Sequence, residues 1–234
     1  MAYQSKHHKS PETQLKIEGV DLNGLSLREF DKVVFEHYGA VCGIDEAGRG
    51  PIAGPVVAAA VLLDPTKPID GLNDSKKLTP KKREALYEEI RSKVLSYCSA
   101  FVWQDEIDAT DILSADLIAM ERAFLNVGRS VGIVLVDGDV LPELYTRPDV
   151  RFDGVLKNVI GGDAKSEAIA AASIIAKVER DEEMCRLAEK YPGYGFEKHK
   201  GYGTKAHYEA IEKLGLCPIH RRSFLKKYIK EDER

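Results

Sequence analysis

Runs of apolar residues alternate with charged segments along the chain and predict buried strands separated by helices. Apolar runs lie at 41–45, 55–63, 94–103 and 131–138, and a fifth strand pattern follows at 155–160. Strands that are apolar on both faces are typical of a sheet that is covered on both sides. We therefore expect an α/β fold in which a mixed five-stranded sheet is flanked by helices.

Helical spacing of apolar residues fills the intervals between these strands. Ser26 and Glu29 form a capping-box pattern in front of an amphipathic helix at 27–37. Five further segments also have helical patterns: 80–92, 111–127, 166–191, 204–214 and 221–230.

Length and composition agree with one main domain and a smaller lobe. The chain has 234 residues and is 44% hydrophobic, which is enough to bury a sizeable core. We expect an N-terminal extension at 1–38, made of a loose arm and a short helix. A sheet domain at 39–191 and a C-terminal helical lobe at 192–234 would follow.

Other compositional features exclude several classes of protein. The N-terminus has no apolar signal-peptide core, and no apolar run reaches the length of a membrane-spanning helix. The cysteines form no CxxC pair and are typical of isolated thiols in a reducing compartment: Cys42, Cys98, Cys185 and Cys217. We therefore expect a cytoplasmic protein with no membrane segment, and we expect a monomer.

Basic residues gather in two segments, although the net charge is −4. Residues 198–230 carry nine Lys or Arg against two Glu, and a second basic cluster lies at 76–83. A charge run is more often a solvated face than a binding surface. On composition alone that ordinary interpretation is favoured, and a nucleic-acid surface is the alternative.

Acidic residues at the ends of predicted strands are the strongest chemical signal. Asp45 ends the first strand and Asp137 the fourth, and sites in α/β sheets form at such strand ends. Glu46 joins Asp45 at one site only if the strand has ended by Glu46. Asp163 is a further candidate, although taken alone it is more typical of a cap before the long helix. Oxygen ligands without His or Cys nearby favour Mg²⁺ or Mn²⁺ over zinc.

A glycine-rich loop follows the paired acids. Gly48 and Gly50 flank Arg49 and let the backbone bend and approach a ligand closely. The loop lacks the GK[ST] ending of a P-loop and the spacing of GxGxxG. A nucleotide-binding kinase or dehydrogenase is therefore disfavoured, and a tight turn with solvated charges is the simpler alternative to a phosphate-binding loop.

Aromatic and basic residues interleave at 194–208. Tyr194 or Tyr202 could stack on a sugar or a base while Lys198 and Lys200 contact phosphates. The alternative is a surface loop whose tyrosines pack inward. The histidines in and after this segment are more often packing or surface residues than ligands, and we assign them no catalytic role: His199, His207 and His220.

Several stretches together resemble one known family, type 2 ribonuclease H (ribonuclease HII). They are GIDEAGRGPIAGPVVAAAV at 43–61, NDSKKLTPKKRE at 73–84, VDG at 136–138, AIAAASIIAKVERD at 168–181, YPGYGFEKHKGYGT at 191–204 and HRRSF at 220–224. The resemblance extends from Ile44 to about residue 225, and DEAGRG with its flanks is its most specific part.

The resemblance implies a ribonuclease H-like sheet, a C-terminal helical lobe and a metal-dependent endonuclease. Family members cleave the RNA strand of RNA–DNA hybrids. They also cut on the 5′ side of single ribonucleotides embedded in duplex DNA, leaving 3′-hydroxyl and 5′-phosphate ends. The implied cofactor is Mg²⁺ or Mn²⁺ in a two-metal site that hydrolyses the phosphodiester. Residues 39–191 would be the catalytic domain, and 192–234 would bind substrate.

Motif positions also imply the roles of individual residues. The catalytic carboxylates, which would also be the metal ligands, are Asp45, Glu46, Asp137 and Asp163. This role replaces the helix cap as the interpretation of Asp163. The backbone at Gly48, Arg49 and Gly50 would read the ribose 2′-hydroxyl, and Tyr202 would pack on the neighbouring deoxyribose. Three lysines would contact phosphates: Lys76, Lys198 and Lys200.

Four positions depart from the pattern common in that family. Asp111 and Asp116 stand where an Asn and a small hydroxyl residue are expected. Gly162 and Ala164 stand where Lys and Ser are frequent. Since the catalytic carboxylates are all present, we expect activity to be kept. An additional acid near the groove would weaken contact with phosphate.

Three other functions remain as alternatives. Type 3 ribonuclease H has a different loop after the paired acids and a longer N-terminal domain, so the GRG loop and Tyr202 favour type 2. A hybrid-binding protein with a degenerate site is disfavoured by the complete set of carboxylates, and it would leave the duplex intact with or without Mg²⁺. A structural α/β domain with solvated charges predicts no metal binding at all.

Overall fold

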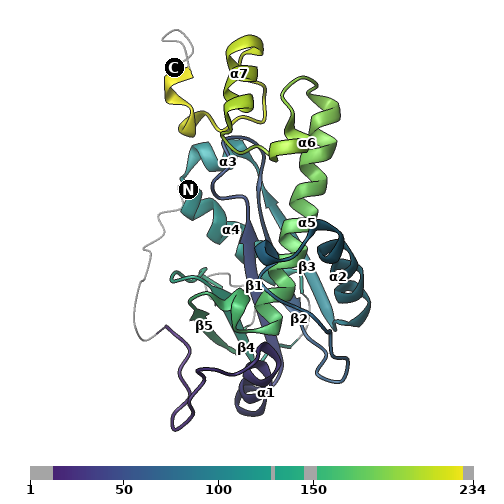
Figure 1. Ribbon diagram of the computed structural model, residues 1–234. Helices are drawn as coiled ribbons and strands as arrows, with labels where there is room; N and C mark the ends of the chain where they lie inside the picture. Colours follow the sequence, from purple (N-terminus) through teal and green to yellow (C-terminus); the bar gives the residue numbers. More distant parts are fainter. Residues whose placement is uncertain (1–12, 128–129, 145–151, 229–234) are drawn as a thin grey trace.

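The computed structural model describes residues 13–127, 130–144 and 152–228 and centres on one mixed sheet (Figure 1). The strands are β1 (Val41–Ala47), β2 (Val56–Leu62), β3 (Ser96–Val102), β4 (Ile133–Asp137) and β5 (Val155–Val159). Their order is β3-β2-β1-β4-β5. β1 pairs antiparallel with β2 and parallel with β4, so the predicted mixed five-stranded α/β fold is confirmed.

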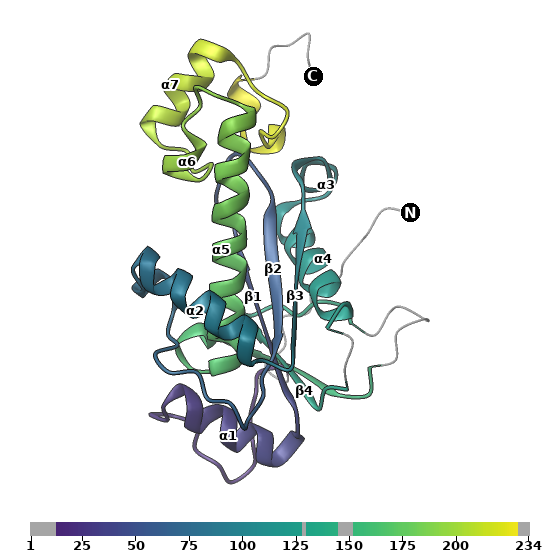
Figure 2. The ribbon, with the colours of Figure 1, turned by 90° about the vertical axis from the view of Figure 1, so that its right-hand side faces the viewer.

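Helices flank the sheet and form the part of the molecule beyond it (Figures 1 and 2). The α-helices are α1 (Leu27–Tyr38), α2 (Pro80–Lys93), α3 (Gln104–Ala109), α4 (Ile112–Leu125), α5 (Glu167–Lys190), α6 (Phe196–His199) and α7 (Lys205–Leu214). The short 3₁₀ helices are η1 (Ser75–Lys77), η2 (Gly162–Ala164), η3 (Arg222–Phe224) and η4 (Lys226–Tyr228).

Two helical predictions need correction. The predicted helix at 221–230 is replaced, as far as Tyr228, by η3 and η4. The start of this segment bonds to a residue far away in the sequence and does not begin an α-helix, since Arg221 N–H donates to the Ile52 carbonyl at 2.9 Å. In addition, α3 occupies a segment between β3 and α4 for which the sequence predicts no helix.

The start of α1 follows its sequence signal. The Ser26 side chain accepts the Glu29 N–H at 3.3 Å, and the Glu29 carboxylate accepts the Ser26 N–H at 2.9 Å. Each partner satisfies a backbone donor that the helix itself cannot pair, and such caps contribute about 1 kcal/mol. The predicted capping box is confirmed.

Residues 13–25 pack against the sheet and are not the loose arm that the sequence predicts. Leu15 N–H donates to the Asn158 carbonyl, and Asn158 N–H donates to the Thr13 carbonyl, both at 3.0 Å. Leu15 and Ile17 are buried. A few apolar residues in a mostly polar stretch therefore fix this segment beside β5.

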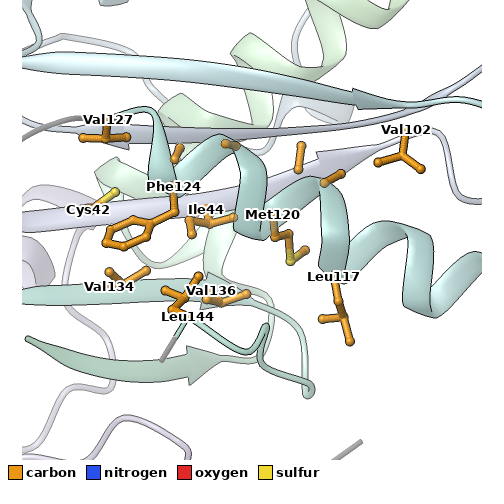
Figure 3. Packing of buried hydrophobic residues seen from close by; sticks show 14 of the residues in the cluster. Cys42, Ile44, Val102, Leu117, Met120, Phe124, Val127, Val134, Val136 and Leu144 are labelled. Atoms are coloured by element: carbon orange, nitrogen blue, oxygen red, sulfur yellow. The ribbon is translucent and has the colours of Figure 1, made fainter. Parts of the chain in front are cut away.

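The two faces of the sheet are covered by different helices. On one face Met120 and Phe124 of α4 pack against Ile44 of β1 and against Val134 and Val136 of β4 (Figure 3). On the other face the alanines of α5 lie on β1 and β2. The edge strands β3 and β5 are largely half-buried, whereas β1, β2 and β4 are mostly buried. The prediction of a sheet covered on both faces is therefore confirmed for its central strands.

The helix α5 joins the sheet to the C-terminal lobe, the part of the chain from residue 192 onwards. Its 24 residues span about 36 Å, and Figure 2 shows it continuing beyond the sheet to α6 and α7. Close contact with the sheet depends on Gly43, where an added Cβ would lie 2.1 Å from the backbone of Ala168. None of the helices in the described ranges is both long and apolar enough to cross a bilayer.

Candidate active site

Asp45 and Asp137 lie on neighbouring parallel strands at the same end of the sheet. Ile44 of β1 is the register partner of Val136 of β4, so the next residue on each strand is one of these aspartates. β1 continues past Glu46 and stays paired with β2, whereas its pairing with β4 stops at Ile44. The predicted end of this strand at Asp45 is therefore wrong by two residues.

Glu46 still interacts with this site, since its charge affects Asp45 and the charge of Asp137 affects Glu46. Asp45 is buried, and its Oδ1 accepts the Glu46 N–H at 2.7 Å. Ser173 of α5 lies near Asp45, and its hydroxyl is 2.9 Å from the hydroxyl of Ser75. Burial raises the pKa of Asp45, and the charges of Glu46 and Asp137 raise it further.

Arg49 partly offsets the charge of Glu46. Its Nη1 lies 3.8 Å from Glu46 Oε1, which is an ion-pair distance but not a hydrogen bond. Burial raises the pKa of Glu46, Arg49 lowers it and Asp137 raises it again. The net shift is upward, so one half-exposed guanidinium does not neutralise this carboxylate.

The turn at η2 brings Asp163 to the same place. Gly162 N–H donates to Asp137 Oδ1 at 2.6 Å and holds η2 against the end of β4. A Cβ added at Gly162 would lie 2.4 Å from Cδ1, the end of the Ile169 side chain, which would have to shift to make room. Burial and the charge of Asp137 raise the pKa of Asp163. We refer to Asp45, Glu46, Asp137 and Asp163 as the acid site.

Asp163 is not the cap of α5. The N-cap is Ser166, whose hydroxyl accepts the Ile169 N–H at 3.3 Å. Asp31 of α1 accepts a second free donor, the Ala168 N–H, at 2.7 Å. The helix-cap interpretation that Asp163 suggests when taken alone is therefore wrong.

Lys76 of η1 stands beside the acid site. Burial by itself lowers the pKa of Lys76, but the charges of Asp45, Asp163 and Asp74 outweigh it and raise that pKa. The Asp74 carboxylate accepts the Lys76 N–H at 2.9 Å and so fixes the start of η1. The Lys76 ammonium thus lies near the carboxylates, on a turn whose start is fixed by Asp74.

The acid site supplies oxygen donors only. In the described part of the chain, no three Asp, Glu, His or Cys side chains stand close enough together to hold a metal ion. Buried like charges repel one another unless a cation neutralises them. By type, these oxygen donors suit a hard divalent cation such as Mg²⁺ or Mn²⁺, and binding one would require the carboxylates to move closer together.

A buried arginine of the C-terminal lobe holds the glycine loop, which we define as residues 48–55. Arg221 is fully buried and donates to the carbonyls of Gly48 at 2.6 Å, Arg49 at 3.0 Å and Gly54 at 2.9 Å. The guanidinium thereby satisfies carbonyls that the loop cannot pair internally. Its position fixes the backbone that follows the acids.

A second buried arginine, Arg180 of α5, holds the other end of the glycine loop. It donates to the Pro55 carbonyl at 2.9 Å and to the Lys200 carbonyl at 3.1 Å. Sequence reasoning assigned no role to Arg180, and it counted Arg221 only among the basic residues at 198–230 that could form a nucleic-acid surface. The available signal for Arg180 was its place within the alanine-rich helix pattern, and for Arg221 its place in HRRSF.

Glycine is needed at position 48 for these contacts. Gly48 has a φ of 101°, and a Cβ there would lie 2.1 Å from the Arg180 side chain. Gly50 faces Tyr202, whose ring would be 3.5 Å from a Cβ at that position. Tyr202 is 47% exposed, so it presents a free aromatic surface next to the loop backbone.

The other two lysines predicted to contact phosphates, Lys198 and Lys200, differ in their surroundings. Lys198 is exposed on α6. Lys200 donates from Nζ to the Glu197 carbonyl and to Cys185 Sγ, both at 2.9 Å. The structure therefore directs the Lys200 ammonium toward α5 and does not bring it to the acid site.

The histidines of the lobe pack together, as expected for residues without a catalytic role. His207 and His220 are buried, and their Nε2 atoms are 3.1 Å apart. The ring of His199 stacks on that of His207 with centroids 4.4 Å apart. Burial lowers the pKa of both His207 and His220 to about 4, which keeps these rings neutral in the core of the lobe.

Comparison with known proteins points to one family. Residues 42–227 match the family model described as Ribonuclease HII. A ribonuclease HII of Idiomarina loihiensis is 55% identical over 184 residues, which are 79% of this chain and 94% of that protein.

Two solved structures resemble the fold. The crystal structure of ribonuclease H2 from Pyrococcus horikoshii OT3 has a TM-score of 0.66 and 31% identity, covering 79% of this chain and 93% of that chain. The structure of Bst ribonuclease HIII in complex with Mn²⁺ has a TM-score of 0.59 and 18% identity, covering 75% of this chain and 63% of that chain. At that identity the second likeness is one of fold alone.

Proposed function

This chain belongs to the ribonuclease HII family, and from that membership we propose the reaction of its acid site. As a member of the family it is a ribonuclease that cleaves the RNA of RNA–DNA hybrids. We propose that it also cuts duplex DNA on the 5′ side of a single embedded ribonucleotide, leaving 3′-hydroxyl and 5′-phosphate ends. The observation that carries the proposal is that acids from β1, β4 and η2 share one electrostatic environment beside a clamped glycine loop.

The catalytic groups in this proposal are the carboxylates of the acid site. Asp45, Glu46, Asp137 and Asp163 hold two divalent cations, Mg²⁺ or Mn²⁺. When bound, such cations activate water for attack on phosphorus and neutralise the oxygen that leaves. The raised pKa values of three of these carboxyls support the assignment, since perturbed acids cluster at catalytic sites.

Lys76 places a positive charge at the same site. Its ammonium interacts with the charges of Asp45 and Asp163, so a phosphate brought to the acids would also approach Lys76. A cation there offsets the repulsion between a phosphate and the carboxylates. We assign Lys76 to substrate positioning.

The glycine loop and Tyr202 recognise the ribonucleotide in this proposal. Backbone groups of Gly48, Arg49 and Gly50 bond to the 2′-hydroxyl, and the Tyr202 ring packs on the next deoxyribose. The short gap between Gly50 and Tyr202 and the clamping of the loop by Arg221 support this role. Lys198 and Lys200 contact phosphates, and for Lys200 this requires release from Cys185.

The same assignment gives the parts of the chain their roles. Residues 39–191 form the catalytic domain and residues 192–234 the substrate-binding lobe. The lobe supplies both Tyr202 and Arg221 to the neighbourhood of the loop, which supports its role in substrate binding. We assign no function to the extension at 1–38.

The test is cleavage of an end-labelled DNA duplex that contains one ribonucleotide, in Mg²⁺ or Mn²⁺, with Asp45→Asn as the inactive control. One cut 5′ to the ribonucleotide that is absent from the control supports the proposal. Cleavage of long hybrids alone would favour a type 3 activity. Tight binding without cleavage of either substrate would show that the acid site is inactive.

A further inference from the structure

Asp116 of α4 is a buried carboxylate that packing does not explain. The residue is 1% exposed and is flanked on the helix by Ala115 and Leu117, both in the core. Its Oδ2 lies 3.6 Å from Arg49 Nε, and its Oδ1 has no hydrogen-bond partner among the described residues. A buried acceptor without a donor is unfavourable, so neither packing nor hydrogen bonding accounts for this side chain.

Asp116 faces the acid site across Arg49. The guanidinium of Arg49 is 3.6 Å from Asp116 and 3.8 Å from Glu46, so both carboxylates lie on one cation. Burial raises the pKa of Asp116, and the charges of Glu46 and Asp137 raise it further, against the opposing effect of Arg49. Through Arg49 the Asp116 carboxylate is thus linked to Glu46, a member of the acid site.

The four carboxylates of the acid site already outnumber the positive charges of Arg49 and Lys76. Asp116 beside Arg49, and Asp74 beside Lys76, add to that excess of negative charge. Affinity for a hard divalent cation rises with the number of charged oxygen groups around it. A free, buried carboxylate oxygen beside Glu46 is placed to supply that additional charge.

We propose that Asp116 is a fifth carboxylate of the cation site and that its charge raises the affinity of the site for a divalent cation. This inference rests on the proposed function, because it needs a cation at the acid site. Asp116 acts on the cation directly, through its Oδ1 or through water, and not only by holding Arg49.

The experiment is titration of the full chain with Mn²⁺ by isothermal calorimetry, without nucleic acid. Asp116→Asn should weaken Mn²⁺ binding roughly tenfold or more, the usual size of an effect near a metal site. Asp111→Asn is the matched control, because it removes one charge from the same helix at the exposed N-cap, where Asn also caps well. The control should stay within about twofold of the parent chain.

The outcomes separate the two proposals. If the parent chain binds no Mn²⁺, the cation site itself is wrong and this inference falls with it. If the parent binds and Asp116→Asn binds equally tightly, only the inference is overturned.

Thermal unfolding without cation checks the fold. The unfolding midpoint of Asp116→Asn should be no lower than that of the parent chain, because the variant loses like-charge repulsion. Added Mn²⁺ should then raise the midpoint of the variant less than that of the parent. Asp116→Ser is the second variant if Asn does not fold.

A double substitution tests whether Asp116 acts through Arg49. In an Arg49→Gln background, Asp116→Asn should still weaken Mn²⁺ binding by a similar factor. If the effect disappears in that background, Asp116 only positions the arginine, and the proposal of a fifth carboxylate is overturned.

Discussion

The glycine loop and the acid site lie side by side at the end of β1, yet they are stabilised in opposite ways. Carbonyls of the loop accept hydrogen bonds from the buried guanidinium groups of Arg221 and Arg180. The acid site gathers charges of one sign, and the pKa of Asp45 is raised by burial and by Glu46. These loop carbonyls are thus paired within the protein, whereas the carboxylates of the acid site repel one another.

This difference separates stability from activity. Removing a charge from the acid site relieves repulsion, so the fold should tolerate it while the reaction is lost. Removing a guanidinium from beneath the loop leaves buried carbonyls without donors, so the fold itself should weaken. Substitutions in the two regions should therefore be distinguishable by measuring unfolding and turnover together.

The largest effect is expected for Asp137→Asn. The variant can still accept the Gly162 N–H, so the turn at η2 should stay in place. The rate of cleavage should fall by at least about a thousandfold, since a charge that supports the reaction is lost. Initial rates on the single-ribonucleotide duplex measure it, with Asp111→Asn as the control. A rate near that of the parent chain would remove Asp137 from the catalytic set.

Arg221→Ala should produce the next largest effect, and on stability. Three loop carbonyls lose their donor, and the free energy of unfolding should fall by about 3 kcal/mol or more. Urea unfolding measures this change. Arg222→Ala changes the exposed neighbour and should have little effect. Equal losses in the two variants would show that the loop does not depend on the buried guanidinium.

Tyr202→Ala should discriminate between substrates. The ring is exposed beside Gly50, so its loss should leave the unfolding midpoint nearly unchanged. Cleavage at a single ribonucleotide should fall about tenfold, as expected for a lost aromatic contact, and cleavage of a long hybrid should fall less. Tyr202→Phe keeps the ring and is the control. The same loss on both substrates would rule out a role at the junction.

An effect that depends on pH is expected for Asp31, which accepts a hydrogen bond from the start of α5. Burial raises its pKa from 3.8 to about 7, so between these values the folded protein keeps a proton that the unfolded chain releases. The free energy of unfolding should therefore fall as pH rises through this window, by up to about 1.4 kcal/mol per pH unit.

Asp31→Asn isolates that contribution, because Asn does not titrate and can still accept the Ala168 N–H. Urea unfolding between pH 4 and 7 should show a shallower dependence for the variant, by up to one proton. Parallel curves for the two proteins would mean that Asp31 ionises normally in the fold.

The elements that the sequence predicted are those with a strong local signal. The capping box of Ser26 and Glu29 locates α1, and the apolar runs locate the central strands within about two residues. The helix predicted at 221–230 fails because the contact between Arg221 and Ile52 joins residues far apart in the sequence. Local periodicity carries no information about such pairing.

The site was less accessible to pattern reasoning than the fold. Strand ends pointed to Asp45 and Asp137, but Asp163 had the pattern of a helix cap and required the family resemblance. The capping groups were Ser166 and Asp31, and Asp31 comes from a helix far along the chain. The buried arginines Arg180 and Arg221 left no pattern in the sequence, because their partners are backbone carbonyls, which every residue carries.

The single helix α5 makes the molecule hard to divide into interchangeable modules. Along this one helix, Ser173 lies near Asp45 of the acid site, Arg180 bonds to the glycine loop, and Met184 packs in the core of the C-terminal lobe. A chimera that exchanges the lobe must therefore preserve the register of this helix and supply an arginine in place of Arg221. A lobe grafted from a relative without the correct register of α5 and without that arginine would misplace the glycine loop relative to the acid site.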